Sequence, residues 1–250
     1  MEIFLRILKG IALGIVQGLT EFLPVSSSGH LLLVEKLGVA PPSVATNLLL
    51  HVATLFAVVI VMRKSVFELV KKPFSKKALW IYLVCIPTAI IGVVFKLFFE
   101  DVLLGKYLSP CFLLTAILLL LPPPTKLKLK PFASGIAVGL AQGLAVLPGL
   151  SRSGTTIACM NAVGIEKERQ VELSFLISIP VIVGGAIFEL KDVDFASVDP
   201  VMLTSAFLTA FITGIISIKV MLKSYDAVKT PFAIYLLILA VFNMVVDIYI

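Results

Sequence analysis

The chain has 250 residues, of which 59% are hydrophobic and 14% are charged, and its mean hydropathy is +1.09. A soluble domain is about 45–50% apolar and about 25% charged, so this composition excludes the soluble classes. It indicates an all-α polytopic membrane protein. The net charge of +6 is expected in basic loops and not on a nucleic-acid-binding surface.

The first polar feature is a helical hairpin expected over about residues 5–36. Its apolar start lacks an A-x-A-like cleavage site, so we expect it to be retained. Pro24 has no N–H and is predicted to break the first helix. Serines 26–28 are suitable N-cap residues for a short second helix that runs to about Glu35. Because each arm is short and is broken by proline, a re-entrant hairpin is favoured over a full crossing.

Six further apolar segments are long enough to span about 30 Å of hydrocarbon. They lie at 44–62, 78–97, 107–121, 170–188, 202–222 and 231–250.

The charges of the connecting loops predict the topology. Loops 63–77, 122–131 (with Lys126) and 219–229 are basic, whereas loop 189–200 (with Asp194) is acidic. Cytoplasmic loops collect Lys and Arg. We therefore expect the three basic loops inside the cell, and the acidic loop and both termini outside, in a multi-pass plasma-membrane protein.

The chain also repeats itself. Residues 10–29 read GIALGIVQGLTEFLPVSSSG and residues 135–154 read GIAVGLAQGLAVLPGLSRSG, with ten of twenty pairs identical at a shift of 125 positions. We predict one membrane domain, 1–250, built from repeats 1–125 and 126–250, with a second re-entrant hairpin at about 132–163. In the weakly matching later halves we align Thr88 with Thr209 and Gly92 with Gly214.

The loop charges make the first hairpin begin and end outside and the second begin and end inside. The repeats are therefore expected to be inverted, an arrangement known from transporters, with a site near the bilayer midplane.

Each hairpin break leaves a helix N-terminus inside the protein, where free N–H groups and a partial positive charge suit phosphate. In the second hairpin, Pro148 and Gly149 break the chain and Ser151 can cap the next helix. Arg152 follows, and a guanidinium matches phosphate oxygens with paired donors. In the first hairpin, Gln17 and Glu21 share a helix face. Ionisable residues in membrane segments are costly and usually functional.

These residues resemble a known family. The pattern Gln17-x-x-x-Glu21 with PVSSSGH at 24–30, together with PGLSRSGTT at 148–156, is similar to the paired signatures of the undecaprenyl-diphosphate phosphatases of the bacitracin-resistance type. The resemblance covers essentially the whole chain. It implies removal of the terminal phosphate of a polyprenyl diphosphate at the outer leaflet, which recycles the lipid carrier for cell-wall glycans.

The resemblance further implies a divalent cation, Mg²⁺ or Ca²⁺, and a possible homodimer. Many members have Glu where this chain has Gln17, so Glu21 is the main carboxylate left to hold the cation.

Our mechanistic hypothesis is phosphoryl transfer, with Ser27 as nucleophile, His30 as base and later acid, and Arg152 as the clamp on the diphosphate. Glu21 either orients His30 or binds the cation. The remaining substrate-binding residues are predicted to be Gln17, Ser26, Ser28, Gly149, Ser151, Ser153, Gly154 and Thr156. Two alternatives stay open, in which His30 is the nucleophile, or His30 or Glu21 activates water directly.

Other residues have structural interpretations. The glycines at 10, 14 and 18 suggest a close-packing helix face, His51 is interpreted as structural, and the three cysteines as buried apolar residues. A second functional class is transport, in which a lipid-phosphate flippase would use the same anion site without hydrolysis. The Ser27/His30 pair favours an enzyme, because binding alone does not require it.

Overall fold

The computed structural model describes residues 1–39, 43–121, 127–193 and 199–249. Its helical elements are α1 (Glu2–Thr20), α2 (Ser27–Lys36), α3 (Val44–Val61), α4 (Arg63–Lys71), α5 (Lys76–Phe98), η1 (Val102–Lys106), α6 (Leu108–Leu120), α7 (Pro131–Leu144), α8 (Arg152–Ala162), α9 (Lys167–Glu189), η2 (Leu190–Asp192) and α10 (Pro200–Tyr249). Within these ranges there is no strand, and α1, α3, α5, α9 and α10 are long and apolar enough to cross a membrane. The predicted all-α polytopic fold is confirmed.

Several predicted boundaries are wrong. The predicted segments 202–222 and 231–250 both lie in α10, which consists of two helices joined at a kink at Ser224 (φ −136°, ψ 21°). The connection predicted over 219–229 is therefore much shorter than expected. Loop 63–77 contains α4, and segment 107–121 forms only the 13-residue helix α6. Pro24 does not end the first helix, since α1 has 19 residues and ends at Thr20. Lys126 and Asp194 lie outside the described residues.

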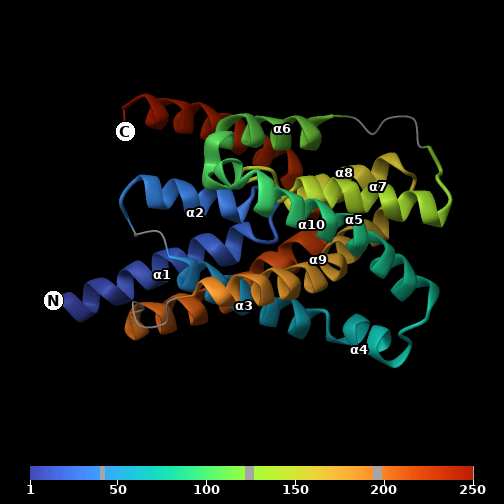
Figure 1. The fold of residues 1–250 in the computed structure, drawn as a ribbon, viewed down its shortest axis with the longest axis horizontal. Helices are drawn as coiled ribbons and strands as arrows, with labels where there is room; N and C mark the ends of the chain where they lie inside the picture. The colour runs from blue at the N-terminus through green and yellow to red at the C-terminus, as the bar shows by residue number, and fades with distance from the viewer. Residues whose placement is uncertain (40–42, 122–126, 194–198, 250) are drawn as a thin grey trace.

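Ion pairs show which elements share an end of the molecule. Arg6 on α1 lies 3.4 Å from Asp199 at the start of α10, and Lys36 at the end of α2 lies 2.6 Å from Asp247 near the end of α10. Both chain termini therefore lie at one end (Figure 1).

α9 begins at the end of the molecule opposite the termini (Figure 1). The bend of α10 lies there too, because Lys167 at the start of α9 contacts Asp226, close to the bend, at 2.9 Å. Figure 1 shows α4 at that end too. The α1–α2 hairpin thus starts and finishes at the end with the termini. The α7–α8 hairpin starts and finishes at the other end, where Leu127 N donates to Ala162 O at 3.1 Å.

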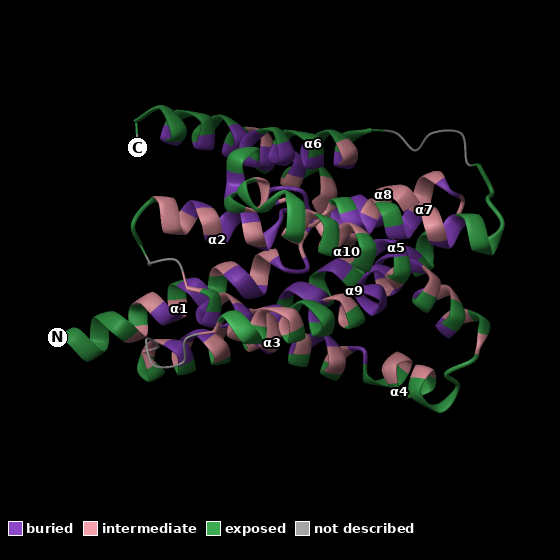
Figure 2. Ribbon diagram, in the orientation of Figure 1, coloured by how far each residue is buried: buried purple, intermediate pink, exposed green. Residues whose placement is uncertain are grey.

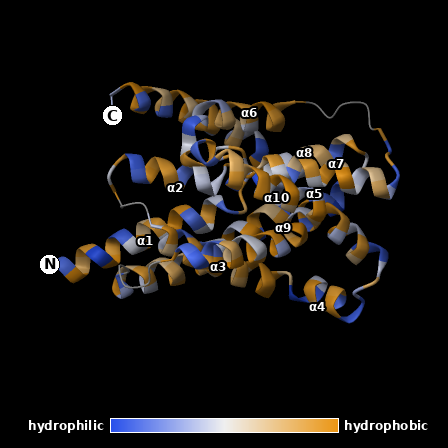
Figure 3. Cartoon of the chain, viewed as in Figure 1, coloured by the Kyte–Doolittle hydropathy of each residue, from blue (hydrophilic) through white to orange (hydrophobic). Residues whose placement is uncertain are grey.

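The buried residues form the centre of the molecule, where the helices cross, and exposed residues cover α4 and the ends (Figure 2). The main cluster includes Phe22 at the tip of the first hairpin and Phe175 of α9, whose ring centroids are 5.3 Å apart. Figure 3 shows hydrophobic residues along most helices, with hydrophilic residues gathered on α4 and the start of α1. Exposed apolar helix surface is expected where lipid is the solvent.

Glycines let the first arm of each hairpin approach another helix closely. A Cβ added at Gly14 would lie 2.5 Å from the Ala206 carbonyl of α10, and one added at Gly139 would lie 2.4 Å from the Val84 carbonyl of α5. The close-packing role predicted for the α1 glycines is therefore present, and α7 packs on α5 in the same way.

The two contacts are equivalent across the repeat. Thr213 Oγ1 donates to Gly14 O at 3.2 Å, and Thr88 Oγ1 donates to Gly139 O at 3.0 Å. Thr88 and Thr213 are 125 positions apart, as are Gly14 and Gly139. The structure thus pairs Thr88 with Thr213, and our alignment of Thr88 with Thr209 is wrong. A single shift of 125 positions relates both halves.

We expect Gly14→Ala to lower the free energy of unfolding by about 1–3 kcal/mol, because the added methyl group overpacks the α1–α10 contact. Gly184→Ala is the matched control, since a Cβ there would meet no atom within 4 Å among the described residues. Unfolding in detergent measures both. Equal stability of the two variants would contradict the close packing.

Candidate functional site

We call the segment that joins the two helices of a hairpin its tip; the first tip joins α1 to α2 and the second joins α7 to α8. The two tips meet at the centre of the protein. Gly149 N of the second tip donates to Ser26 Oγ of the first at 3.0 Å. Ser153 Oγ, on the first turn of α8, donates to Leu23 O at 3.3 Å. The N-termini of α2 and α8 are thereby held close together, and their first N–H groups have no partner within their own helices.

The first tip is built around Ser26. Its φ of +70° is unusual for a residue with a side chain, and such a conformation costs of order 1–3 kcal/mol. Ser26 is the N-cap of α2 and accepts from Gly29 N at 3.4 Å. His30 Nδ1 donates to Ser26 O at 2.7 Å, which holds the strained peptide in place.

The second tip is built around Gly149 and Ser151. Gly149 has φ +90°, and a Cβ there would lie 2.6 Å from Leu108 O, so only glycine fits. Ser151 caps α8 by accepting from Gly154 N at 3.2 Å, as predicted for this residue. Thr115 of α6 donates to Gly149 O at 2.9 Å and accepts from Ser151 N at 3.0 Å, and so joins both residues.

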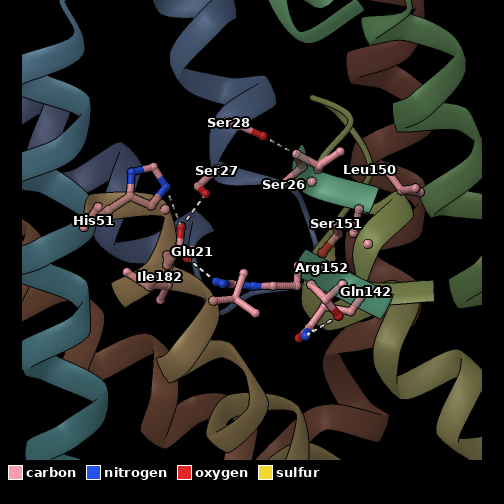
Figure 4. Close-up of a pocket in the computed structure, with 18 of the residues that line it drawn as sticks. Glu21, Ser26, Ser27, Ser28, His51, Gln142, Leu150, Ser151, Arg152 and Ile182 are labelled. Carbon is pink, nitrogen blue, oxygen red and sulfur yellow. Dashed lines mark hydrogen bonds and ion pairs between the residues drawn. The ribbon is translucent and has the colours of Figure 1, made fainter. Parts of the chain in front are cut away.

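Glu21 is the centre of the polar network (Figure 4). One carboxylate oxygen accepts from Arg152 of the other hairpin. The second oxygen accepts from Ser27 Oγ at 2.5 Å and from Gln17 Nε2 at 3.0 Å. The side chain of Glu21 is 2% exposed, so its charge is balanced inside the protein by the guanidinium and these donors.

A cavity of about 300 Å³ opens beside this network. Six predicted site residues line it: Glu21, Ser26, Ser27, Ser28, Ser151 and Arg152. Figure 4 shows Ser27 and Arg152 both directed at Glu21, from α2 and α8 respectively. The cavity therefore holds a nucleophile, a carboxylate and a guanidinium, together with two helix N-termini.

The predicted pairing of Ser27 with His30 is wrong. His30 does not line the cavity. Its Nδ1 is bonded to Ser26 O, its Nε2 lies 2.7 Å from Tyr235 Oη, and its ring lies between those of Tyr235 and Phe112. Both ring nitrogens are therefore used in holding the tip.

The histidine in the cavity is His51 of α3, which we had interpreted as structural. Its Nδ1 donates to Asn47 O at 2.8 Å, because a carbonyl can only accept. Its Nε2 lies 3.7 Å from the Glu21 carboxylate. His51, and not His30, thus presents a ring nitrogen toward Glu21 in the cavity (Figure 4).

Five other predicted substrate-binding residues do not line the cavity but support it. Gly149 and Ser153 join the tips as described above, Gln17 donates to Glu21, and Thr156 pairs with Ser174 Oγ of α9 at 2.7 Å. Gly154 packs against Ser151 and Pro24. These residues stabilise the position of the tips without lining the cavity themselves.

The polar cavity residues that were missed also include Thr88 of α5 and Gln142 of α7. Gln142 is 2% exposed and donates to Thr88 Oγ1 at 3.2 Å, while its Oε1 has no partner among the described residues. Gln142 is the repeat equivalent of Gln17, which was the available signal. For His51 the signal was an ionisable residue inside a membrane helix.

The residues present do not fit a self-sufficient cation site. Among the described residues there is no group of three His, Cys, Asp or Glu side chains placed to hold a metal. Both oxygens of Glu21 already accept from protein donors. A divalent cation usually needs several oxygen ligands. The dependence on Mg²⁺ or Ca²⁺ implied by the family resemblance stays a prediction, with Glu21 as its predicted ligand.

Thr115→Val should lower the free energy of unfolding by about 1–3 kcal/mol, because it leaves two buried backbone groups of the second tip unpaired. Thr54→Val is the control, since Thr54 is equally buried but donates only within α3, to Leu50 O and His51 O. Denaturant titration in detergent compares the two. If both variants lose the same stability, Thr115 does not hold the tip.

Comparison with known proteins fits this geometry. The family model "Bacitracin resistance protein BacA" matches residues 10–242. An "Undecaprenyl-diphosphatase" from Carboxydothermus hydrogenoformans is 38% identical over 252 residues, covering 96% of this chain and 97% of that protein. Proteins with the same name from Methanococcus vannielii (36% identical, 93% and 97% covered) and Thermosipho melanesiensis (37% identical, 94% and 97% covered) are also similar. The chain therefore belongs to the bacitracin resistance protein BacA family.

Proposed function

We propose that this protein is a membrane-embedded phosphatase that converts a long-chain polyprenyl diphosphate, of the undecaprenyl type, into the monophosphate and inorganic phosphate. The observation that carries this proposal is the 2.5 Å contact between Ser27 Oγ and the Glu21 carboxylate beside Arg152, inside a cavity within the membrane domain. The names of the similar proteins support the same reaction. Through that reaction it recycles the lipid carrier for cell-wall glycan synthesis.

The substrate's phosphates are held by positive charge and by N–H groups. Arg152 donates to Glu21 and to no other side chain among the described residues. A guanidinium has five N–H donors, so others are available for phosphate oxygens. The helix N-termini at Ser27 and Arg152 add dipoles that favour an anion. In phosphoryl transfer, such fixed positive groups supply most of the stabilisation of the transition state.

In the first step Ser27 Oγ attacks the terminal phosphorus and its proton passes to Glu21, which already accepts its hydrogen bond. The bond between the terminal phosphorus and the bridging oxygen breaks, and the polyprenyl monophosphate leaves. In the second step water attacks the phosphoserine, Ser27 Oγ leaves and takes its proton back from Glu21. His51 Nε2, facing the cavity, can accept the proton of that water.

This scheme replaces the hypothesis in which His30 is the base. His30 becomes a positioning residue, because its bond to Ser26 O fixes the turn that presents Ser27. Direct activation of water by Glu21 is the remaining alternative for the first step. A role as a transporter is not favoured, because the Ser27–Glu21 pair has no use in binding alone.

We also propose that the cavity faces the outer leaflet. The end with α4 carries Arg63, Lys64 and Lys71, whereas Glu189 and Asp192 lie at the other end with both termini. The positive-inside rule then places the basic end in the cytoplasm. Because Glu189 lines the cavity, the cavity reaches toward the outer end. A homodimer remains a prediction of the family resemblance.

Purified protein in detergent should release phosphate from undecaprenyl diphosphate, and Ser27→Ala should lower kcat by roughly 10³-fold or more, as expected for loss of a nucleophile. Substrate labelled in its terminal phosphate should leave acid-stable label on Ser27 after rapid quenching.

Ser28→Ala is the matched control, because Ser28 also lines the cavity but contacts Ser26 Oγ at 3.3 Å and not Glu21. Loss of one such hydrogen bond should cost about fivefold to tenfold in rate. Full activity of Ser27→Ala would shift the first step to water activated by Glu21. No phosphate release by the unmodified protein would refute the phosphatase itself.

A further inference from the structure

The cavity has a second wall away from the hairpin tips, built from α5 and α9. Gly92 of α5 and Gly185 and Ala186 of α9 line it. A Cβ added at Gly92 or Gly185 would meet no atom within 4 Å among the described residues, and Gly185 is exposed. The cavity therefore reaches the protein surface between these two helices, and we call this opening the α5–α9 slot.

The slot follows from the way the two helices pack. At the basic end they are tied together, since Lys77 Nζ donates to Glu172 Oε1 at 2.7 Å, and Ile81 and Phe175 share the main buried cluster. Pro180 then interrupts the hydrogen bonding of α9 just before the slot residues, and proline inside a helix causes a kink. Gly92 and Gly185 both lie in the half of these helices beyond this packed end.

The repeat shows which hydrogen bond Gly92, one residue of the slot, cannot make. Ser217 Oγ of α10 donates to Gly18 O of α1 at 2.7 Å and helps to close that pair of helices. The equivalents, 125 positions away, are Gly92 of α5 and Gly143 of α7. Gly92 has no hydroxyl to make the matching bond, and both glycines line the cavity. At this point α5 and α7 meet through Ile91, which a Cβ added at Gly143 would approach to 2.7 Å, whereas a Cβ added at Gly92 would meet no atom within 4 Å among the described residues. Gly92 therefore leaves its side of α5 open to the cavity.

The cavity has another opening, which is lined by charged side chains. A neighbouring hollow of about 440 Å³ shares Glu189 with the cavity. Its other charged lining residues are Lys96, Glu100, Lys191 and Asp192. An apolar chain has nothing to gain beside hydrated charges, which are costly to strip of water. This opening suits inorganic phosphate and not a hydrocarbon chain.

We propose that the α5–α9 slot is the subsite for the isoprenoid chain of the substrate, which passes between Gly92 and Gly185 into the lipid while its diphosphate lies at the hairpin tips. Ile90 and Ile187 of the same two helices are exposed apolar side chains, as expected where these helices face lipid. The proposal rests on the proposed function, because it assigns the chain of that lipid substrate.

The test compares Gly185→Leu with Gly184→Leu on a long and a short substrate. Gly184 is the adjacent exposed residue of α9 and does not line the cavity. With undecaprenyl diphosphate, Gly185→Leu should lower kcat/KM by about tenfold or more, as expected when bulk obstructs a substrate subsite. With isopentenyl diphosphate, whose chain is too short to reach through the slot, both variants should match the unmodified protein. Gly92→Leu, from the facing helix, should behave as Gly185→Leu does.

The proposed subsite would be refuted if Gly185→Leu lost the same kcat/KM on both substrates or lost none on either. It would also be refuted if Gly184→Leu had the same effect. Activity on the short substrate also shows that each variant is folded. If the unmodified protein hydrolyses neither substrate, the proposed function fails. Thiol labelling then tests separately whether the slot binds a polyprenyl chain. Long-chain polyprenyl monophosphate, but not inorganic phosphate, should slow maleimide labelling of Gly185→Cys above the background of the native cysteines. The same rate with and without the lipid would reject the subsite.

Discussion

The ion pair between Glu21 and Arg152 is the interaction on which the rest of the site depends. It joins two hairpins that enter the protein from opposite ends, with the Glu21 side chain 2% exposed and the Arg152 side chain 18% exposed. Removing one member of a buried ion pair typically costs about 3–5 kcal/mol, because the other charge is left uncompensated. Ser27, Gln17 and His51 are all arranged around the same carboxylate, so the pair both closes the structure and orients the reactive groups.

The two halves share the same helix packing but differ in the residues that they contribute to the site. In each half a glycine-rich arm packs on a helix of the other half, with Thr88 and Thr213 making matching hydrogen bonds. The first tip contributes the serine and the carboxylate, and the second contributes the guanidinium. At Gly92 the first half lacks the hydroxyl that Ser217 provides in the second half, and Gly92 lines the cavity.

Much of this arrangement could be predicted from the sequence, because the repeat and the loop charges constrain the topology and the tip residues carry the chemistry. Glu21, Ser27 and Arg152 were predicted as site residues from their types and positions, and all three line the cavity. The wrong assignment of His30 has a physical cause: spacing i, i+3 from Ser27 suggested contact, but Tyr235, more than 200 positions away in the sequence, holds its second nitrogen. His51 and Gln142 were missed because they join the cavity only through packing of α3 and α7. The end of α1 was misplaced because Pro24 lies within the turn and not at the helix end.

A double-mutant cycle on kcat/KM with Glu21→Gln, Arg152→Gln and the double variant tests most directly whether the two hairpins form one catalytic unit. Residues that act as a unit show strongly non-additive effects. If the two hairpins form one catalytic unit, the double variant falls within about tenfold of the worse single variant. Losses that multiply, as for two independent sites, would contradict it.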